Sequence, residues 1–437
     1  MSLSTPPKIQ RLQASLYDKA KLEPECRFHF LYDKIYREDV LAHAYALSRQ
    51  NGGAPGVDGQ SFEDVEAYGS GRWLSELKAE LHEKRYRPKP VRRVMIPKPG
   101  GVGERPLGIP TIRDRVVQTA AKLVLEPIFE AVFDDAAHGY RPGRSAHDAI
   151  RKVHEALRAG HTEVVDADLS KYFDTIPHAE LIKCLTRRIS DGDVLHLIKL
   201  WLKVPVEERD DKGNRRMTGG KKSKMGTPQG GVISPLLANV YMHRYIKAFR
   251  QHGLAERYGA VLVNYADDFV VLCKRGADEV HEITRRWMTR IGLALNEQKT
   301  VVRDVWKEPF EFLGYRFGIM YSPRTGGRYF GATPSKRAIA RLREGVRGRL
   351  HPGNQAPWPE VAKRLNRTLV GWANYFDYGT VQALRKKLDW DVHLHVRGFL
   401  RRRHKLHGRG TRRFSQEKVL GELGVVSLHA LRAKALS

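Results

Sequence analysis

The sequence predicts an α+β protein followed by a basic, mostly helical region. Short apolar runs of strand length recur beside Gly, Pro, Asn and Asp, which indicates strands and hairpins. Segments with helical spacing of apolar residues lie between them. Past residue 330 the composition changes: 107 residues carry 23 Lys and Arg against 7 Asp and Glu. We therefore expect a domain boundary between 325 and 331.

Each element follows from a local pattern. Residues 1–50 mix polar and apolar residues at helical spacing, and the Gly-, Pro- and Asn-rich stretch that follows indicates an ordered loop. Pro and Gly interrupt short extended runs in the expected hairpins. The expected domains are 1–50, a helical extension; 51–325, the mixed domain; and 331–437, the basic helical domain. The expected helices are 71–85, 112–133, 178–203, 232–253 and 277–292; the hairpins are 87–110 and 204–224 (turning at DDKGN); and strands are expected within 161–177, 261–272 and 310–319.

The charge indicates a polyanionic partner. Lys and Arg number 77 against 49 Asp and Glu, a net charge of +28 with a pI near 10.0. Such a chain favours nucleic acid over a membrane surface, because no basic helix has a wide apolar face. Three scattered cysteines exclude a disulfide framework and argue against structural zinc. Without an apolar leader or long apolar run, the chain is expected to be soluble and cytoplasmic, with no membrane partner.

Two adjacent acids, Asp267 and Asp268, lie between the apolar runs of VLVNYADDFVVL at 261–272. Asp is common in turns, so an exposed hairpin turn is the simple interpretation. The flanking residues are too apolar for a loose surface turn. A packed hairpin tip that holds a divalent cation satisfies both facts, since Mg²⁺ binds one or two carboxylates plus substrate phosphates.

A second acidic stretch, VVDADLSKYFD, supplies Asp166, Asp168 and Asp174. Asp166 and Asp168 are two residues apart and share one face of a strand. Alone, they could simply cap a strand end. Three carboxylates gathered from two strands can hold two Mg²⁺ about 4 Å apart, which suits phosphoryl transfer.

YADD in a hairpin, preceded by an acid-bearing strand that ends in FD, resembles the catalytic centre of reverse transcriptases. Other blocks occur in the order seen in reverse transcriptases of bacterial group II introns, and the resemblance runs from about residue 30 to the end. These blocks are GGAPGVDG at 52–59, RRVMIPKPGG and RPLGIPTIRDRVVQ within 92–118, HGYRPGRSAHDAI at 138–150, MGTPQGGVISPLLANVYM at 225–242, LALNEQKT at 293–300, FEFLGYRF at 310–317, and PSKRAIARL, LNRTLVGWANYF and FLRRRHKLHGRG after 330.

The resemblance implies a right-hand polymerase fold with fingers, an antiparallel-sheet palm and a helical thumb and maturase domain. It implies RNA-directed DNA synthesis from dNTPs on an RNA template and DNA primer, with two Mg²⁺, or Mn²⁺ in their place. It also implies binding of the parent intron RNA as a ribonucleoprotein, assisting splicing and retrohoming. The oligomeric state stays open. The short, cysteine-poor end predicts no endonuclease domain of the Cys/His-bearing kind, so mobility would need another primer.

The site residues carry over from the family's motifs. Asp168, Asp267 and Asp268 are expected as catalytic metal ligands, with Asp166 the weaker candidate for the first. Phe173 falls at the steric-gate position, where a ring excludes a 2′-OH, although core packing is its simple interpretation. The remaining expected contacts are Lys98, Arg105 and Gln229 with the nucleotide, and Lys299, Arg401, Arg402, Arg403 and Lys405 with nucleic acid.

Simpler interpretations stay open for several of these. The finger hairpin with Lys98 and Arg105 could be a solvated surface, and the basic run 397–413 a solvated helix face. Trp372, Tyr375 and Phe376 are expected in the core. Two rival functions also remain: a splicing-only maturase with a vestigial polymerase site, and a domesticated reverse transcriptase in phage defence or DNA repair.

Overall fold

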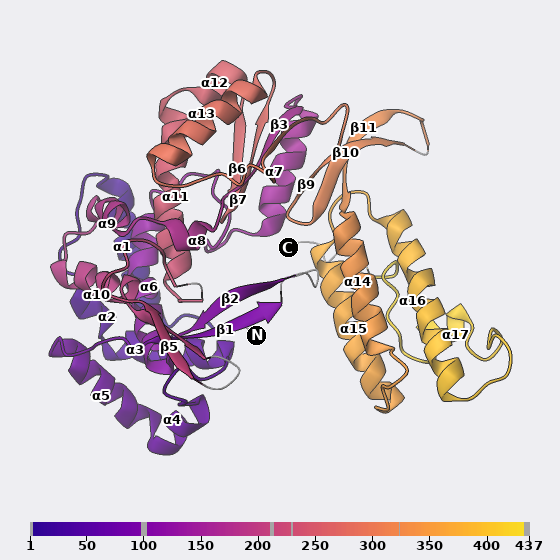
Figure 1. Ribbon diagram of the computed structural model, residues 1–437, viewed down its shortest axis with the longest axis horizontal. Coiled ribbons are helices and arrows are strands. Elements are labelled where there is room, and N and C mark those ends of the chain that lie inside the picture. The colour runs from indigo at the N-terminus through magenta and orange to yellow at the C-terminus, as the bar shows by residue number, and fades with distance from the viewer. Residues whose placement is uncertain (1–2, 98–102, 210–213, 229, 323, 432–437) are drawn as a thin grey trace. The chain divides into compact units, whose positions relative to one another are not determined.

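The computed structural model describes residues 3–97, 103–209, 214–228, 230–322 and 324–431. The chain divides into two compact units. The first consists of Met1–Ala149 and Val165–Val302, and the second of Ile150–Val164 and Arg303–Ser437. Both mix helices with sheets (Figure 1), which confirms the α+β class. The predicted domain limits stay predictions.

In the first unit, helices α1 and α3 pack against α6, which begins after Thr111. Arg115 donates hydrogen bonds to the carbonyl oxygens of Pro110 and Ala54. Gly56 lies so close that a Cβ there would be 2.7 Å from the Cα of Thr111. The glycine-rich loop is therefore fixed on the start of α6. These helices are α1 (Pro7–Leu22), α2 (Tyr32–Ile35), α3 (Glu38–Asn51), α4 (Phe62–Tyr68), α5 (Ser70–His82) and α6 (Ile112–Glu130).

Two antiparallel hairpins join into one sheet of order β2-β1-β4-β5. Their inner strands run parallel, with Val91 opposite Val206. Both expected hairpins are thus present, although the DDKGN turn falls largely at 210–213, outside the described residues. The strands are β1 (Val91–Pro97), β2 (Glu104–Ile109), β4 (Pro205–Arg209) and β5 (Arg215–Gly219).

The sheet of order β6-β7-β3-β8 carries the acidic motifs. Helices α11 and α13 cover one of its faces (Figure 1): the ring of Tyr245 lies 5.4 Å from Phe269 and 6.3 Å from Trp287, between centroids. The elements are β3 (Glu163–Asp168), α8 (Tyr172–Thr175), α9 (His178–Thr186), α10 (Gly192–Leu202), α11 (Ser234–Gln251), α12 (Leu254–Tyr258), β6 (Val261–Tyr265), β7 (Asp268–Cys273), α13 (Ala277–Arg290) and β8 (Val301–Asp304).

In the second unit, a sheet of order β11-β10-β9 adjoins a set of helices. His154 lies 2.7 Å from the hydroxyl of Tyr378 and 2.8 Å from the carbonyl oxygen of Phe330, which fixes α7 there. Trp372 and Phe376 are buried, as predicted. The elements are α7 (Ala146–Arg158), β9 (Phe310–Phe312), β10 (Tyr315–Tyr321), β11 (Arg328–Pro334), α14 (Lys336–Arg349), α15 (Trp358–Tyr375), α16 (Gln382–Arg403) and α17 (Gln416–Leu420).

Two element predictions were wrong. The expected helix 178–203 is two helices, because Asp191 accepts hydrogen bonds from the backbone N–H groups of Asp193 and Val194 and starts a new helix. The expected strand 310–319 is a hairpin, whose turn residues Leu313 and Gly314 have φ of 49° and 79°. Within the described residues, no helix is long and apolar enough to cross a membrane.

Candidate active site

The acid pair lies at the tip of the β6–β7 hairpin. Tyr265 pairs with Asp268, so the connection is the two-residue turn Ala266–Asp267. Ala266 has φ of 61°, a conformation that costs about 1 kcal/mol for a residue with a Cβ. The side chain of Asn264 donates a hydrogen bond of 2.9 Å to the carbonyl oxygen of Ala266 and closes the turn. The hairpin thereby places two consecutive carboxyl groups at its tip, Asp267 in the turn and Asp268 at the start of β7.

The HGYR block at 138–141 packs against this turn. The backbone N–H of His138 donates to the carbonyl oxygen of Asn264 (2.8 Å), and Asn239 donates to that of Gly139 (2.8 Å). A Cβ on Gly139 would lie 2.5 Å from the backbone nitrogen of Ala266. Only glycine, which has no Cβ, allows the two backbones to come this close, so the block packs directly against the hairpin turn and holds it in place.

The first acid lies beside the segment 293–300. The backbone N–H of Asn296 donates to the carbonyl oxygen of Asp168 at 2.8 Å, and its side-chain amide donates to the carboxylate at 3.2 Å. The ammonium group of Lys299 lies 2.9 Å from the same carboxylate. Lys299 is 65% exposed, so this ion pair is a solvated one.

The carboxyl groups at the hairpin tip have raised pKa values. Desolvation is the largest cause for both, and the negative charge of Asp168 adds to each. The pKa of Asp268 rises to about 6, with Asp267 as the second cause. Lys299 lowers both values, and Arg105 also lowers the pKa of Asp267. Asp168 raises the pKa of both hairpin acids, so the three carboxyl groups lie in one region, where a cation would favour the charged forms of Asp267 and Asp268.

The three acids fit a divalent cation by their chemistry. Carboxylate oxygens are the ligands that Mg²⁺ and Mn²⁺ prefer. Within the described residues, no three His, Cys, Asp or Glu side chains are arranged closely enough to hold a metal. The ammonium group of Lys299 lies 2.9 Å from the Asp168 carboxylate, at a position that a cation bound to this carboxylate would compete for.

Phe173 lies at the edge of the acidic site. Its ring is half-buried and meets Tyr140 edge-to-face at 6.3 Å between centroids. Its carbonyl oxygen accepts a hydrogen bond of 2.7 Å from the backbone N–H of Thr227. The pKa of Tyr140 is raised by burial and then by Asp267, which places that phenol near the acids. Phe173 therefore contacts the loop after β5 and Tyr140, the phenol that lies near the acids.

Of the predicted nucleotide contacts, only some are described. Arg105 on β2 is exposed and close enough to influence Asp267 and Tyr140. Lys98 and Gln229 lie outside the described residues. Asp166 is half-buried on β3, and Asp168 on the same strand is among the causes that raise the pKa values of the hairpin carboxyls.

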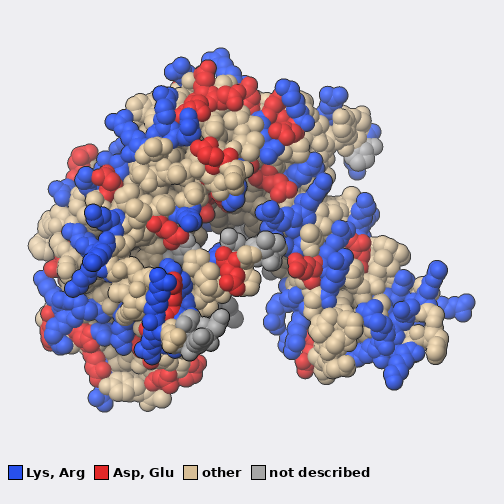
Figure 2. Space-filling view, in the orientation of Figure 1, with Lys and Arg blue, Asp and Glu red and all other residues tan. Residues whose placement is uncertain are grey.

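The predicted basic contacts in the second unit lie at the end of α16, where Lys and Arg side chains gather in Figure 2. All are exposed. Arg403 donates hydrogen bonds to the carbonyl oxygens of Ala356 (2.7 Å) and Gln355 (3.3 Å), and Arg401 donates to that of Gly408 (3.3 Å). Arg402 makes no such contact among the described residues. These arginines therefore differ: Arg403 holds a loop, and Arg402 is free for a ligand.

Sequence reasoning missed the supporting residues of the site. Asn296, Gly139 and Tyr140 entered only as letters of larger blocks. The sequence offered one signal for each: Asn296 lies three residues before Lys299, and Gly139 and Tyr140 belong to the HGYR block. Lys299 was expected on a nucleic-acid phosphate, and its ion pair with Asp168 was not foreseen.

Comparison with known families accounts for most of the chain. A family model described as reverse transcriptase (RNA-dependent DNA polymerase) matches residues 96–317, and one described as the group II intron maturase-specific domain matches 339–416. The chain belongs to the group II intron reverse transcriptase–maturase family. Membership confirms the predicted family and the class of RNA-directed DNA polymerase. Its two domains imply nucleic-acid binding, and reverse transcriptases use divalent metal ions.

The relatives of this group II intron reverse transcriptase–maturase differ in how much of their own length the chain matches. Protein YkfC of Escherichia coli K12 is 35% identical over 345 residues, 70% of this chain and 88% of that protein. The group II intron-encoded protein LtrA of Lactococcus lactis is 35% identical over 220 residues, 50% of this chain and 35% of LtrA. A 91 kDa protein in the cob intron of Schizosaccharomyces pombe is 27% identical, over 79% of this chain and 50% of its own length. The chain thus spans half or less of the matched intron proteins.

Proposed function

We propose that Asp168, Asp267 and Asp268 form the metal site of an RNA-templated DNA polymerase that extends a DNA primer with dNTPs. The single observation that supports this most is the two-residue turn, which places Asp267 and Asp268 where Asp168 raises their pKa values. Two Mg²⁺ or Mn²⁺ ions at such a site supply activation of the primer 3′-OH and neutralise the leaving pyrophosphate.

The chain's own residues then have distinct tasks. Asn296 orients Asp168 through two hydrogen bonds, and Lys299 supplies a positive charge beside it. Arg105 is exposed and can bind a triphosphate. Lys98 and Gln229, outside the described residues, are proposed to contact the nucleotide as the family's motifs imply. Phe173 would lie under the sugar and exclude a ribose 2′-OH.

We further propose that the natural partner is a group II intron RNA, bound as a ribonucleoprotein that assists splicing and retrohoming. The maturase-specific match at 339–416 supports this, as does the similarity to a protein named as group II intron-encoded. The net charge of +16 after residue 330 fits a large RNA. We also propose a cytoplasmic location in a bacterium, as the resemblance to the reverse transcriptases of bacterial group II introns implies.

Primer extension on an RNA template tests the polymerase. We expect Asp267→Asn to reduce extension by about 100-fold or more while the fold persists, because one carboxylate of the metal site is lost. Glu297→Gln is the matched control: it removes an exposed carboxylate from the neighbouring segment and should leave the rate within about twofold. Equal rates for the two variants would show that Asp267 does not serve the reaction.

The steric role of Phe173 has a separate readout. Phe173→Val should raise the incorporation of ribonucleotides relative to deoxyribonucleotides by about tenfold or more, because space opens for a 2′-OH. If Phe173 only fills the core, the variant will lose stability and leave the ratio unchanged.

A further inference from the structure

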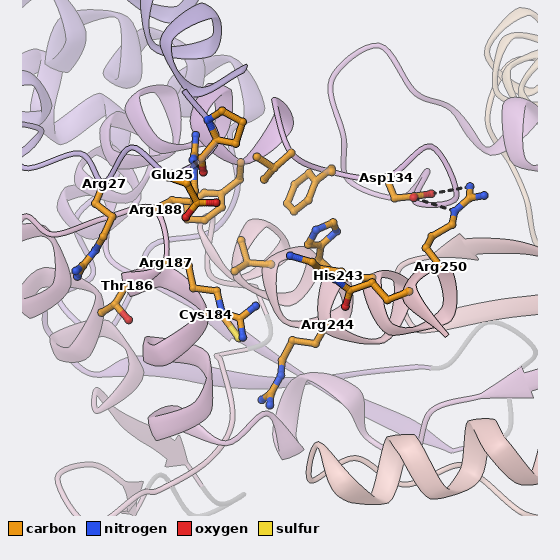
Figure 3. Close-up of a pocket in the computed structure, with 17 residues that line it drawn as sticks. Glu25, Arg27, Asp134, Cys184, Thr186, Arg187, Arg188, His243, Arg244 and Arg250 are labelled. Carbon is orange, nitrogen blue, oxygen red and sulfur yellow. Dashed lines mark hydrogen bonds and ion pairs between the residues drawn. The ribbon is translucent and has the colours of Figure 1, made fainter. Parts of the chain in front are cut away.

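A hollow of about 760 Å³ opens in the first unit on side chains that take no part in the acidic site. Residues of the second half of α11, the end of α9, the end of α6 with the segment after it, and the connecting segment 24–27 line it (Figure 3). The volume lies within the range of about 300–1,000 Å³ that is typical of ligand sites.

Positive charge dominates the lining. Of the two acids, Asp134 is already paired with Arg250 at 3.1 Å, and Glu25 is exposed. None of the described residues pairs with the side chains of Arg27, Arg187 or Lys247, and all three are exposed. The six cations of the lining are Arg27, Arg187, Arg188, Arg244, Lys247 and Arg250.

One wall of the hollow is held firmly. Arg188 is buried and donates hydrogen bonds to the carbonyl oxygens of Ala20 (2.6 Å) and Pro24. The backbone N–H of Phe28 donates to the carbonyl oxygen of Arg188 at 2.8 Å. Arg188 therefore serves the fold, and the segment that carries Arg27 is fixed against α9. A preformed wall lowers the entropic cost of binding.

The floor offers aromatic faces. The half-buried ring of Phe133 stacks near Phe129, at 6.4 Å between centroids, and lies 5.8 Å from the imidazole of His243. Burial lowers the pKa of His243 to about 4, so its ring is neutral at pH 7. The guanidinium of Arg141 already lies over the Phe133 ring at 5.4 Å from its centroid, so a base would use the remaining ring surface. Neutral rings beside unpaired cations suit a flat base attached to a phosphate.

A second hollow of about 650 Å³ adjoins the first. The two share Arg187, Arg244, Lys247 and Gln251, so Arg187 and Lys247 lie where the hollows meet, a place that we call the cationic ridge; Arg244 is already paired with Glu180 at 3.1 Å. The second contains Trp287, half-buried, with the ring of His252 at 5.1 Å. The cationic residues shared by the two hollows thus lie between the hollow with Phe133 and the hollow with Trp287.

We propose that the paired hollows bind a single-stranded nucleic acid, with a phosphodiester on the ridge of Arg187 and Lys247 and a base in each hollow. Neither hollow includes a residue of the acidic site, so this would be a second nucleic-acid contact of the first unit. A strand fits better than a free mononucleotide because two base-accepting hollows flank one phosphate-binding ridge. Binding here does not depend on polymerisation.

Crosslinking and chemical protection of the full chain test the proposal. The probe is a single-stranded RNA of about ten nucleotides with 5-iodouracil, and a DNA of the same sequence serves as a second arm. Crosslinked peptides are identified by mass spectrometry, and the reactivity of Lys247 toward an acetylating reagent is measured with and without RNA. The test variant is Arg187→Gln with Lys247→Gln. The control is Lys8→Gln with Arg11→Gln, which removes two exposed charges from α1, away from the hollows.

We expect crosslinks to Phe133 or Trp287 and protection of Lys247. Raising salt from about 50 to about 200 mM should weaken wild-type crosslinking there about sevenfold more than in the test variant, because two counterion-releasing contacts are lost. Primer extension of the test variant should stay within about twofold of wild type. Comparable yields with DNA would support the proposal and show that no 2′-OH is read.

Three outcomes would overturn it. One is an unprotected Lys247 at saturating RNA, with protection confined to other lysines. Another is equal crosslinking at these rings in the test and control variants. The third is full protection of Lys247 by uridine monophosphate at the same nucleotide concentration, which would mean a free-nucleotide site. In Asp267→Asn, crosslinking at these rings should stay at the wild-type yield while primer extension is lost, because the hollows contain no residue of the acidic site.

Discussion

Replacing Asp268 with asparagine should stabilise the metal-free protein. The pKa of Asp268 is raised from 3.8 to about 6, chiefly by desolvation and then by Asp267 and Asp168. At 1.36 kcal/mol per unit, a fully enclosed carboxylate would cost about 3 kcal/mol at pH 7.5. The residue is crowded by protein but exposed to solvent, so screening reduces the expected gain to about 1–2 kcal/mol. Its side chain makes no hydrogen bond in the described structure that asparagine would lose.

The pH dependence carries a definite sign. A carboxyl whose folded-state pKa is raised destabilises the protein above that pKa, and the cost fades as pH falls from about 6 toward 3.8. The advantage of Asp268→Asn should therefore be largest at pH 7.5 and about half as large at pH 5. In thermal unfolding with EDTA, the gain at pH 7.5 corresponds to about 2–6 °C.

Glu297→Gln again provides the matched control, because it removes one exposed carboxylate whose described electrostatic partner, Arg285, is itself exposed. A variant Asp268→Asn that is no more stable than this control would refute the reasoning. So would an equal gain at both pH values, since the effect would then not arise from the charge. Added Mn²⁺ should stabilise wild type more than the variant, because the ion offsets the repulsion.

Three further predictions concern the neighbouring residues. Lys299→Gln should tighten Mn²⁺ binding about two- to fivefold in a titration, because an ammonium group no longer competes for Asp168; weaker binding would contradict this. Gly139→Ala should reduce primer extension about tenfold or more by displacing the hairpin turn, whereas Gly71→Ala, where a Cβ meets open space, should not. Arg402→Gln should lower the salt dependence of RNA binding with an unchanged melting temperature, and an unchanged salt dependence would mean that this arginine faces solvent.

The sequence was most informative where chemistry and periodicity agree. VLVNYADDFVVL has two apolar arms around a short polar centre, and only a tight hairpin places both arms in a core. The acids of this hairpin and of the preceding strand could be assigned to one sheet because the order of the motifs matched a known family. Elements broken by a single local interaction were harder to predict, as with the side chain of Asp191 between α9 and α10.

The supporting contacts could not be predicted, because they join segments far apart in sequence. Gly139 meets Ala266 and Asn296 meets Asp168 across more than a hundred residues each. No periodicity links such pairs. The cationic hollow could not be predicted for the same reason. Arg27, Arg187 and Lys247 are far apart in the sequence, and only the folded chain brings them together.

The positive φ of Ala266 limits how the hairpin tip can be altered. Glycine would relieve its strain, since glycine adopts this conformation without cost. Glycine would also let the turn sample other shapes, so the direction of the following carboxyl would be less well defined. A more stable protein and a slower polymerase could result from the same substitution. Alanine at position 266 therefore accepts a less favourable backbone conformation and in return keeps the Asp267 carboxyl group in a defined direction.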